Sequence, residues 1–170
     1  MSTTTNTTSH LASDKFHFIV QNEVAEANIT QPIPEDELRE LALASIDFVL
    51  RHYQEEFEEV EFTLRIVDAE EGQELNRQFR NKDYPTNVLT FEYGVDETAT
   101  LRADIVICVA IVLQEAQEQG KDFIQHFKHL LVHGVLHALG FDHESDDEAD
   151  SMEALEIEIL AQFAIKNPYL

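Results

Sequence analysis

The chain has 170 residues, 44% of them hydrophobic, so it can form one compact domain with a buried core. Its 34 acidic and 11 basic residues give a net charge of −23, which repels nucleic acid at long range. Such a charge either keeps the protein soluble or indicates a basic partner. With no apolar stretch near the ~18 residues that span a membrane, no N-terminal targeting signal and only one cysteine, Cys108, the chain is predicted to be cytoplasmic and free of internal disulfides.

Residues 1–13 are rich in Ser, Thr and Asn and are predicted to form a disordered tail ahead of a single domain at 14–170. Hydrophobic periodicity predicts, in chain order, a strand at 16–21, a helix at 34–53, a strand at 61–68, a short helix at 69–80, strands at 87–93 and 103–109, and helices at about 110–119, 122–139 and 146–163. Four early strands followed by late helices predict an α+β fold with one mixed four-stranded sheet covered by helices.

The helix predicted at 122–139 is apolar on almost every side except for its histidines. His133 and His137 are four residues apart, which places their imidazoles on adjacent turns of one face, where both can bind one ion. Gly140 can adopt a positive φ and end the helix, so that the chain returns His143 to the same point. Three imidazoles that leave positions open for water are typical of a catalytic site with one Zn²⁺, and Ni²⁺ or Cu²⁺ would also suit such ligands.

The spacing H-x3-H-x2-G-x2-H is also the ligand frame of the metzincin proteases, whose general base directly follows the first histidine. That position is Gly134 here, which cannot take a proton, so the pattern argues against a peptidase. His126 and His129 are assigned no ligand role and are expected to be solvated or hydrogen-bonded at the surface, or to line the cleft beside the metal. Asp142 is expected either to orient His143 as a hydrogen-bond acceptor or to stabilise the turn.

The stretch "HGVLHALGFDH" (133–143) resembles the signature of the YbeY-type endoribonucleases and departs from it at Ala138. The block "ELNRQFRNKDYPTNVLTF" (74–91) and the strand "ADIVIC" (103–108), with Ala103 where Gly is usual, are similar to that family as well. So are "DEADSMEALE" and the closing "NPY", and the likeness covers most of residues 60–170.

The resemblance implies a zinc-dependent, single-strand-specific endoribonuclease that acts in ribosomal RNA maturation, at the 3′ end of 16S RNA, and in ribosome quality control. By position, it makes His133, His137 and His143 the metal ligands and Arg80 the catalytic residue of the cleft. Read without the family, Arg80 would be a surface cation that suits the end of a helix. The implied partners are single-stranded RNA, the small ribosomal subunit and basic ribosomal proteins, with no membrane and no DNA.

Two alternatives stay open: another metal-dependent hydrolase, and a non-catalytic ribosome-assembly factor whose metal holds the fold. The attacking group also stays open, because either a metal-activated water or a 2′-hydroxyl of the RNA fits the motif. Six cations in the half of the chain around the motifs predict a local positive groove beside the histidines. They are Arg77, Arg80, Lys82, Arg102, Lys121 and Lys128.

Overall fold

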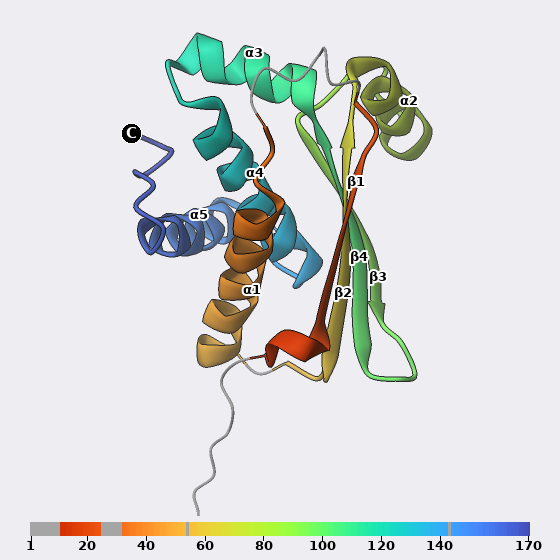
Figure 1. The fold of residues 1–170 in the computed structure, drawn as a ribbon, viewed down its shortest axis with the longest axis vertical. Helices are drawn as coiled ribbons and strands as arrows, with labels where there is room; N and C mark the ends of the chain where they lie inside the picture. The colour runs from red at the N-terminus through yellow and green to blue at the C-terminus, as the bar shows by residue number, and fades with distance from the viewer. Residues whose placement is uncertain (1–10, 25–31, 54, 143) are drawn as a thin grey trace, which may run out of the picture.

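The computed structural model describes residues 11–24, 32–53, 55–142 and 144–170, which form a four-stranded sheet flanked by helices (Figure 1). The elements, in chain order, are η1 (Ser13–Lys15), β1 (Phe16–Asn22), α1 (Glu35–His52), β2 (Glu59–Val67), α2 (Ala69–Arg80), β3 (Val88–Val95), β4 (Thr100–Cys108), α3 (Val109–Gln119), α4 (Phe123–Ala138) and α5 (Asp146–Ala161). The predicted α+β class and the order of four strands and five helices are confirmed. None of the helices in these ranges is long and apolar enough to span a membrane.

The sheet is mixed, with the strand order β1-β2-β4-β3. β1, β2 and β4 run parallel, while β3 pairs antiparallel with β4 through the short connection between them. The register places Leu64 of β2 between Val20 and Ile105, and Ile105 beside Thr90 of β3. β3 is therefore an edge strand, and its outer side is available to help form a site.

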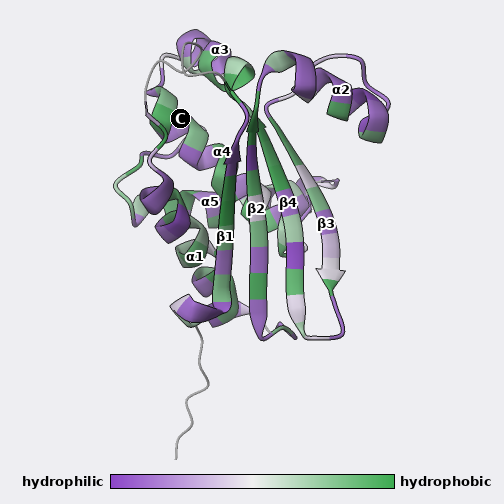
Figure 2. Cartoon of the chain, turned by 45° about the vertical axis from the view of Figure 1, so that its right-hand side comes forward, coloured by the Kyte–Doolittle hydropathy of each residue, from purple (hydrophilic) through white to green (hydrophobic). Residues whose placement is uncertain are grey.

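Alternation along the strands separates the two faces of the sheet. In β2, alternate residues are fully buried against the helices α1 and α4; they are Val60, Phe62, Leu64 and Ile66. The strands accordingly show hydrophobic and hydrophilic bands in Figure 2. The opposite face has a smaller apolar cluster around Val106 and Cys108, which α2 covers at one end of the sheet. Cys108 is buried, and burial raises the pKa of its thiol, as suits an inert core residue.

α4 lies between the sheet and α5 (Figure 1). α5 starts at a capping box, in which the Ser145 side chain accepts from the Glu148 N–H and the Glu148 side chain accepts from the Ser145 N–H. Its buried residues include Met152, Ile159 and Leu160, which belong to the main core. This packing brings α5 against the helix that carries the predicted metal ligands.

The predicted N-terminal tail lies only partly within the described part of the chain, because residues 1–10 lie outside it. Leu11, inside the predicted tail, is buried in the core, and its N–H donates to Asp47 Oδ1 at 2.7 Å. η1 follows directly and leads into β1. The core therefore includes a residue that composition alone assigns to the tail.

Candidate active site

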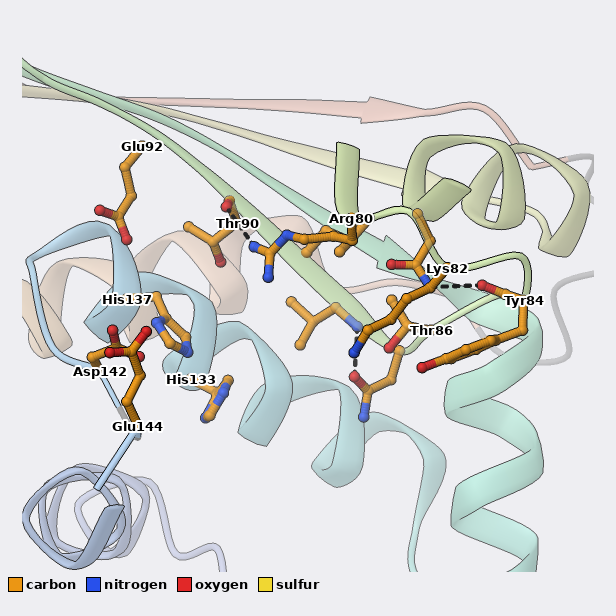
Figure 3. Close-up of a pocket in the computed structure, with 14 residues that line it drawn as sticks. Arg80, Lys82, Tyr84, Thr86, Thr90, Glu92, His133, His137, Asp142 and Glu144 are labelled. Atoms are coloured by element: carbon orange, nitrogen blue, oxygen red, sulfur yellow. Dashed lines mark hydrogen bonds between the residues drawn. The ribbon is translucent and has the colours of Figure 1, made fainter. Parts of the chain in front are cut away.

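A cleft of about 400 Å³ is formed by β3, by α4 with the turn after it, and by the segment that follows α2 (Figure 3). One end contains His133, His137 and the acidic side chains Glu92, Asp142 and Glu144. The other end contains three polar side chains of the segment after α2: Lys82, Tyr84 and Thr86. Arg80 extends between the two ends, so the cleft is acidic at one end and cationic and aromatic at the other.

His133 and His137 lie on adjacent turns of α4 and both line the cleft, as their spacing predicts. Their ring centroids are 4.7 Å apart, with an angle of 76° between the planes. His143, the third predicted ligand, lies outside the described residues, so its position is a prediction still. Within the described ranges, no three His, Cys, Asp or Glu side chains form a group that could hold a metal ion.

Glu156 of α5 is fully buried and fixes the orientation of His133. Its Oε2 lies 2.5 Å from Nδ1 of His133, and its Oε1 lies 3.0 Å from Nε2 of His129 and accepts from the Tyr169 hydroxyl. Burial raises the pKa of Glu156, but the hydrogen bonds from these three side chains outweigh burial and hold the pKa at about 2. The ionised carboxylate can only accept, so Nδ1 of His133 donates to it, and the neutral form of this imidazole has its lone pair on Nε2.

This arrangement fits a metal ion at the imidazoles. A histidine that binds a metal commonly donates its other N–H to a carboxylate, which fixes the tautomer and the ring orientation. The His133–Glu156 pair has this geometry, and His137 presents a second imidazole to the same cleft. Imidazole nitrogen is a donor that zinc prefers in proteins.

Arg80, the last residue of α2, lines the cleft as the family resemblance implies. Its Nη2 lies 3.5 Å from the carbonyl oxygen of Thr90 in β3, which is a long hydrogen bond that a phosphate oxygen could replace. α2 ends at Asn81, whose left-handed backbone (φ 57°) turns the chain toward Lys82. Lys82 lines the cleft too, so both cations of this segment face the same space.

Glu92, at the acidic end of the cleft, has a raised pKa. Partial burial, followed by the charge of Asp142, raises the pKa of Glu92, while Arg80 acts in the opposite direction. Glu92 therefore holds a proton at higher pH than a fully solvated glutamate does. Asp142 lines the cleft. Its predicted contact with His143 lies outside the described residues, so the choice between orienting His143 and stabilising the turn stays a prediction.

His126 and His129 are buried rather than solvated, which corrects the expectation of surface positions. Nε2 of His126 lies 2.9 Å from Glu115 Oε1, and Glu115 also accepts from the side-chain amide of Asn87, a residue of the cleft wall. His129 contacts Glu156 instead. Both histidines thus face carboxylates behind the cleft, and neither lines it.

The predicted positive groove is only partly present, because just two of its six cations, Arg80 and Lys82, line the cleft. The other four have partners elsewhere: Arg77 pairs with Glu74, Arg102 with Glu61 and Asp96, Lys128 with Glu37, and Lys121 donates to the carbonyl oxygen of Pro168. Cations therefore reach the cleft at its middle, through Arg80, and at the end away from the histidines, through Lys82.

Gly134 has a packing role that its sequence position does not reveal. A Cβ at this position would lie 2.7 Å from Cγ2 of Ile105 and 3.4 Å from Oγ1 of Thr90, so α4 packs tightly against the sheet here. A side chain at position 134 would point into the core between helix and sheet. The site therefore has no room for the glutamate that a metzincin carries after its first histidine.

Sequence reasoning did not identify Glu156 or Tyr84 as site residues. Glu156 lies in an acidic helix, but it shares the apolar stripe of Met152, Ile159 and Leu160, and a carboxylate on such a stripe is a signal for a buried partner. Tyr84 has no comparable pattern, since an isolated exposed tyrosine in a loop is ordinary.

Comparison with known proteins gives consistent matches over this region. A family model described as Endoribonuclease YbeY matches residues 23–164 of the chain. A protein named Endoribonuclease YbeY from Janthinobacterium sp. (strain Marseille) is 59% identical over 111 residues, which cover 65% of this chain and 73% of the relative. One of the same name from Bordetella avium (strain 197N) is 55% identical over 115 residues, covering 68% of this chain and 71% of the relative.

The fold has a match among solved structures as well. The solution structure of a Thermotoga maritima protein superposes with a TM-score of 0.53 at 25% sequence identity. The superposition covers 86% of this chain and 91% of the other. The segment matched by the family model spans Arg80, His133 and His137, which line the cleft.

Proposed function

Because this chain belongs to the YbeY endoribonuclease family, we propose that its cleft cleaves single-stranded RNA with the help of one zinc ion. We assign His133, His137 and His143 as the zinc ligands and Arg80 as the catalytic residue that contacts the phosphate. The proposed cellular substrate is ribosomal RNA, with processing at the 3′ end of 16S RNA and a role in ribosome quality control. The small ribosomal subunit and its basic proteins are then the partners.

The observation that carries the proposal is the convergence of three features in one cleft. His133 has its tautomer set by a buried carboxylate, His137 lies beside it, and Arg80 reaches the same space from another helix. Paired imidazoles suit a metal, and a guanidinium suits the phosphodiester that the metal would act on. A metzincin-type peptidase needs a glutamate after its first histidine, and the packing at Gly134 leaves no room for one.

In the proposed reaction, the chain's own residues bind and orient the substrate. When bound, the zinc ion supplies Lewis acidity, which lowers the pKa of water or polarises a phosphoryl oxygen. Arg80 exchanges its long contact with Thr90 for paired hydrogen bonds to the phosphate and stabilises the charge that develops there. Glu156 accepts from Nδ1 of His133 and holds the ring in place, so that Nε2 would be the atom offered to the zinc ion.

The test compares cleavage of a labelled single-stranded RNA by the zinc-loaded protein and by its Arg80→Ala variant. We expect kcat/KM to fall by about 10²–10³-fold, because a donor that stabilises transition-state charge is lost. Arg77→Ala is the matched control, since Arg77 lies in the same last turn of α2 but pairs with Glu74 outside the cleft. Metal analysis should find one zinc per chain in the unaltered protein and less in His133→Ala.

The cellular part of the proposal is tested by replacing the native gene with the Arg80→Ala gene and sequencing the 3′ ends of small-subunit ribosomal RNA. Unprocessed ends should accumulate relative to Arg77→Ala. If Arg80→Ala cleaves and processes RNA like Arg77→Ala, while metal removal unfolds the protein, the metal is structural. The chain would then be a non-catalytic assembly factor, and the proposed activity would be wrong.

A further inference from the structure

Tyr84 differs from the other exposed aromatic side chains in its position. It is 52% exposed, and among the exposed large hydrophobic residues of the described ranges it is the one that lines the cleft. Figure 3 shows its ring turned toward the cleft at the end opposite the histidines. Tyr93 is even more exposed, at 62%, but it lines a separate depression with Phe79 and Phe91.

The backbone at Tyr84 is held in place from the core. The side-chain amide of Asn76, which is buried, donates to the Tyr84 carbonyl oxygen at 2.7 Å. The following Pro85 further limits the backbone of Tyr84, because a residue before proline is disfavoured in the helical conformation. Because tyrosine has only two side-chain torsions, a ring on such a fixed backbone loses little freedom when a ligand binds.

The charges of the cleft determine where an RNA strand can lie. If Arg80 holds the scissile phosphate beside the zinc ion, phosphates that extend past the ion meet Glu92, Asp142 and Glu144, whose charges repel them. At the opposite end, Lys82 is placed to attract the next phosphate. A strand that leaves the cleft on this side passes Tyr84, and a cation beside an aromatic ring is the usual combination in single-strand binding sites.

Building on the proposed function, we infer that Tyr84 forms a nucleobase subsite, in which its ring stacks on a base of the RNA strand beside the phosphate held by Arg80. Stacking requires no particular base, because every base presents a π face. The base must leave its stack within the RNA to reach the ring, so a base in a duplex does not bind. Tyr84 thereby acts as a binding residue, separate from the groups that carry the chemistry.

The test measures the affinity of the zinc-loaded protein for a fluorescein-labelled RNA octamer by anisotropy. The octamer carries 2′-O-methyl groups and phosphorothioate linkages, so that the proposed activity does not cleave it, and a gel verifies that it stays intact. We expect Tyr84→Ala to bind about 5- to 100-fold more weakly, because one base–aromatic stack is lost, and Tyr84→Phe to bind within about twofold of the unaltered protein. Tyr93→Ala is the matched control, since its exposed ring lies outside the cleft.

Octamers with a single abasic unit identify the stacked base. One abasic position should weaken binding to the unaltered protein by a similar factor and should have no further effect on Tyr84→Ala. If Tyr84→Ala binds like Tyr93→Ala, the subsite is wrong, even where Arg80→Ala abolishes cleavage. If Arg80→Ala still cleaves normally, the proposed function fails instead, and the abasic comparison decides the subsite independently.

Discussion

Glu156 shows how one buried side chain can set the properties of a site that it does not line. It accepts hydrogen bonds from α4 through His129 and His133, and from the C-terminal segment through Tyr169. Burial, and then the hydrogen bond to Glu156, raise the pKa of Tyr169, so its hydroxyl stays protonated and donates. Three donors on one ionised carboxylate leave His133 a single tautomer.

Replacing this carboxylate by an amide should weaken the metal site. In Glu156→Gln, the single amide oxygen cannot accept from all of His129, His133 and Tyr169, and the amide NH₂ group faces side chains that are themselves donors. We expect the affinity for zinc to fall by about 10–100-fold, as is usual when the partner of a metal-bound histidine is lost. Titration with a competing zinc chelator measures this affinity. The metal-free protein should also lose about 1–3 kcal/mol of unfolding free energy, because buried polar groups become unsatisfied.

Glu158→Gln is the matched control for this prediction, because Glu158 lies on the exposed side of the same helix. It should keep both zinc affinity and stability. A Glu156→Gln protein that loses stability but binds zinc like Glu158→Gln would show that the network holds the fold and does not orient His133.

At the scale of elements, the contact between α4 and the sheet determines where the histidines lie. The helix is buried on most of its circumference, and Gly134 lets it approach Ile105 of β4. A larger residue there would push the helix away from β3 and β4. Since Arg80 reaches the cleft across β3, the distance between the guanidinium and the imidazoles depends on this packing.

Gly134→Ala should therefore be destabilising, although alanine is the better helix former by about 1 kcal/mol. The added Cβ would lie 2.7 Å from Ile105, and overpacking of this kind costs about 1–3 kcal/mol and displaces the backbone. Urea denaturation measures the change. The control is Gly72→Ala in α2, where the nearest atom is Cys108 Sγ at 3.3 Å and the expected change is under about 1 kcal/mol. Equal stability of Gly134→Ala and the unaltered protein would contradict the tight packing.

Local patterns explain why the elements could be predicted and their pairing could not. α2 occupies the predicted range because it has a signal at each end: Asp68 accepts from the Glu71 N–H, and Asn81 adopts the left-handed conformation. Strand order depends on contacts between distant segments, which periodicity does not contain. The pairing of β3 with β4 continues past a bulge between Glu92 and Gly94, so β3 ends at Val95, two residues beyond the predicted end.

The same division applies to the candidate site. His133 and His137 could be found because helical spacing brings them together within one element. Only the family resemblance indicates Arg80, because the end of α2 meets the cleft residues of β3 and α4 only once the chain is folded. Glu156 follows His133 by 23 residues and lies in a different helix. In the sequence, it differs from the neighbouring acidic residues only in sharing the helix face of the apolar residues.

At the scale of the whole molecule, the charge is distributed unfavourably for RNA. The chain carries −23 overall, and the ion pairs of Arg77, Arg102 and Lys128 neutralise these cations on the surface. The cleft itself presents two cations to a strand, Arg80 at its middle and Lys82 at the end away from the histidines. Binding to RNA should thus depend on few phosphate contacts and on stacking, rather than on a broad basic surface.

This predicts a shallow dependence of RNA affinity on salt. Each phosphate contact with a single strand contributes a slope of about −0.7 to the plot of log K against log salt concentration, so two contacts give about −1.4. Salt also screens the repulsion from the acidic body, which makes the slope shallower still. Anisotropy titrations of the metal-free protein at several salt concentrations measure this slope.

Lys82→Ala should make the slope shallower by about 0.7, because one phosphate contact is lost. Lys128→Ala is the control and should leave the slope unchanged, because Lys128 pairs with Glu37 away from the cleft. A slope steeper than about −3 would mean that cations outside the cleft bind RNA, contrary to the charge distribution described here.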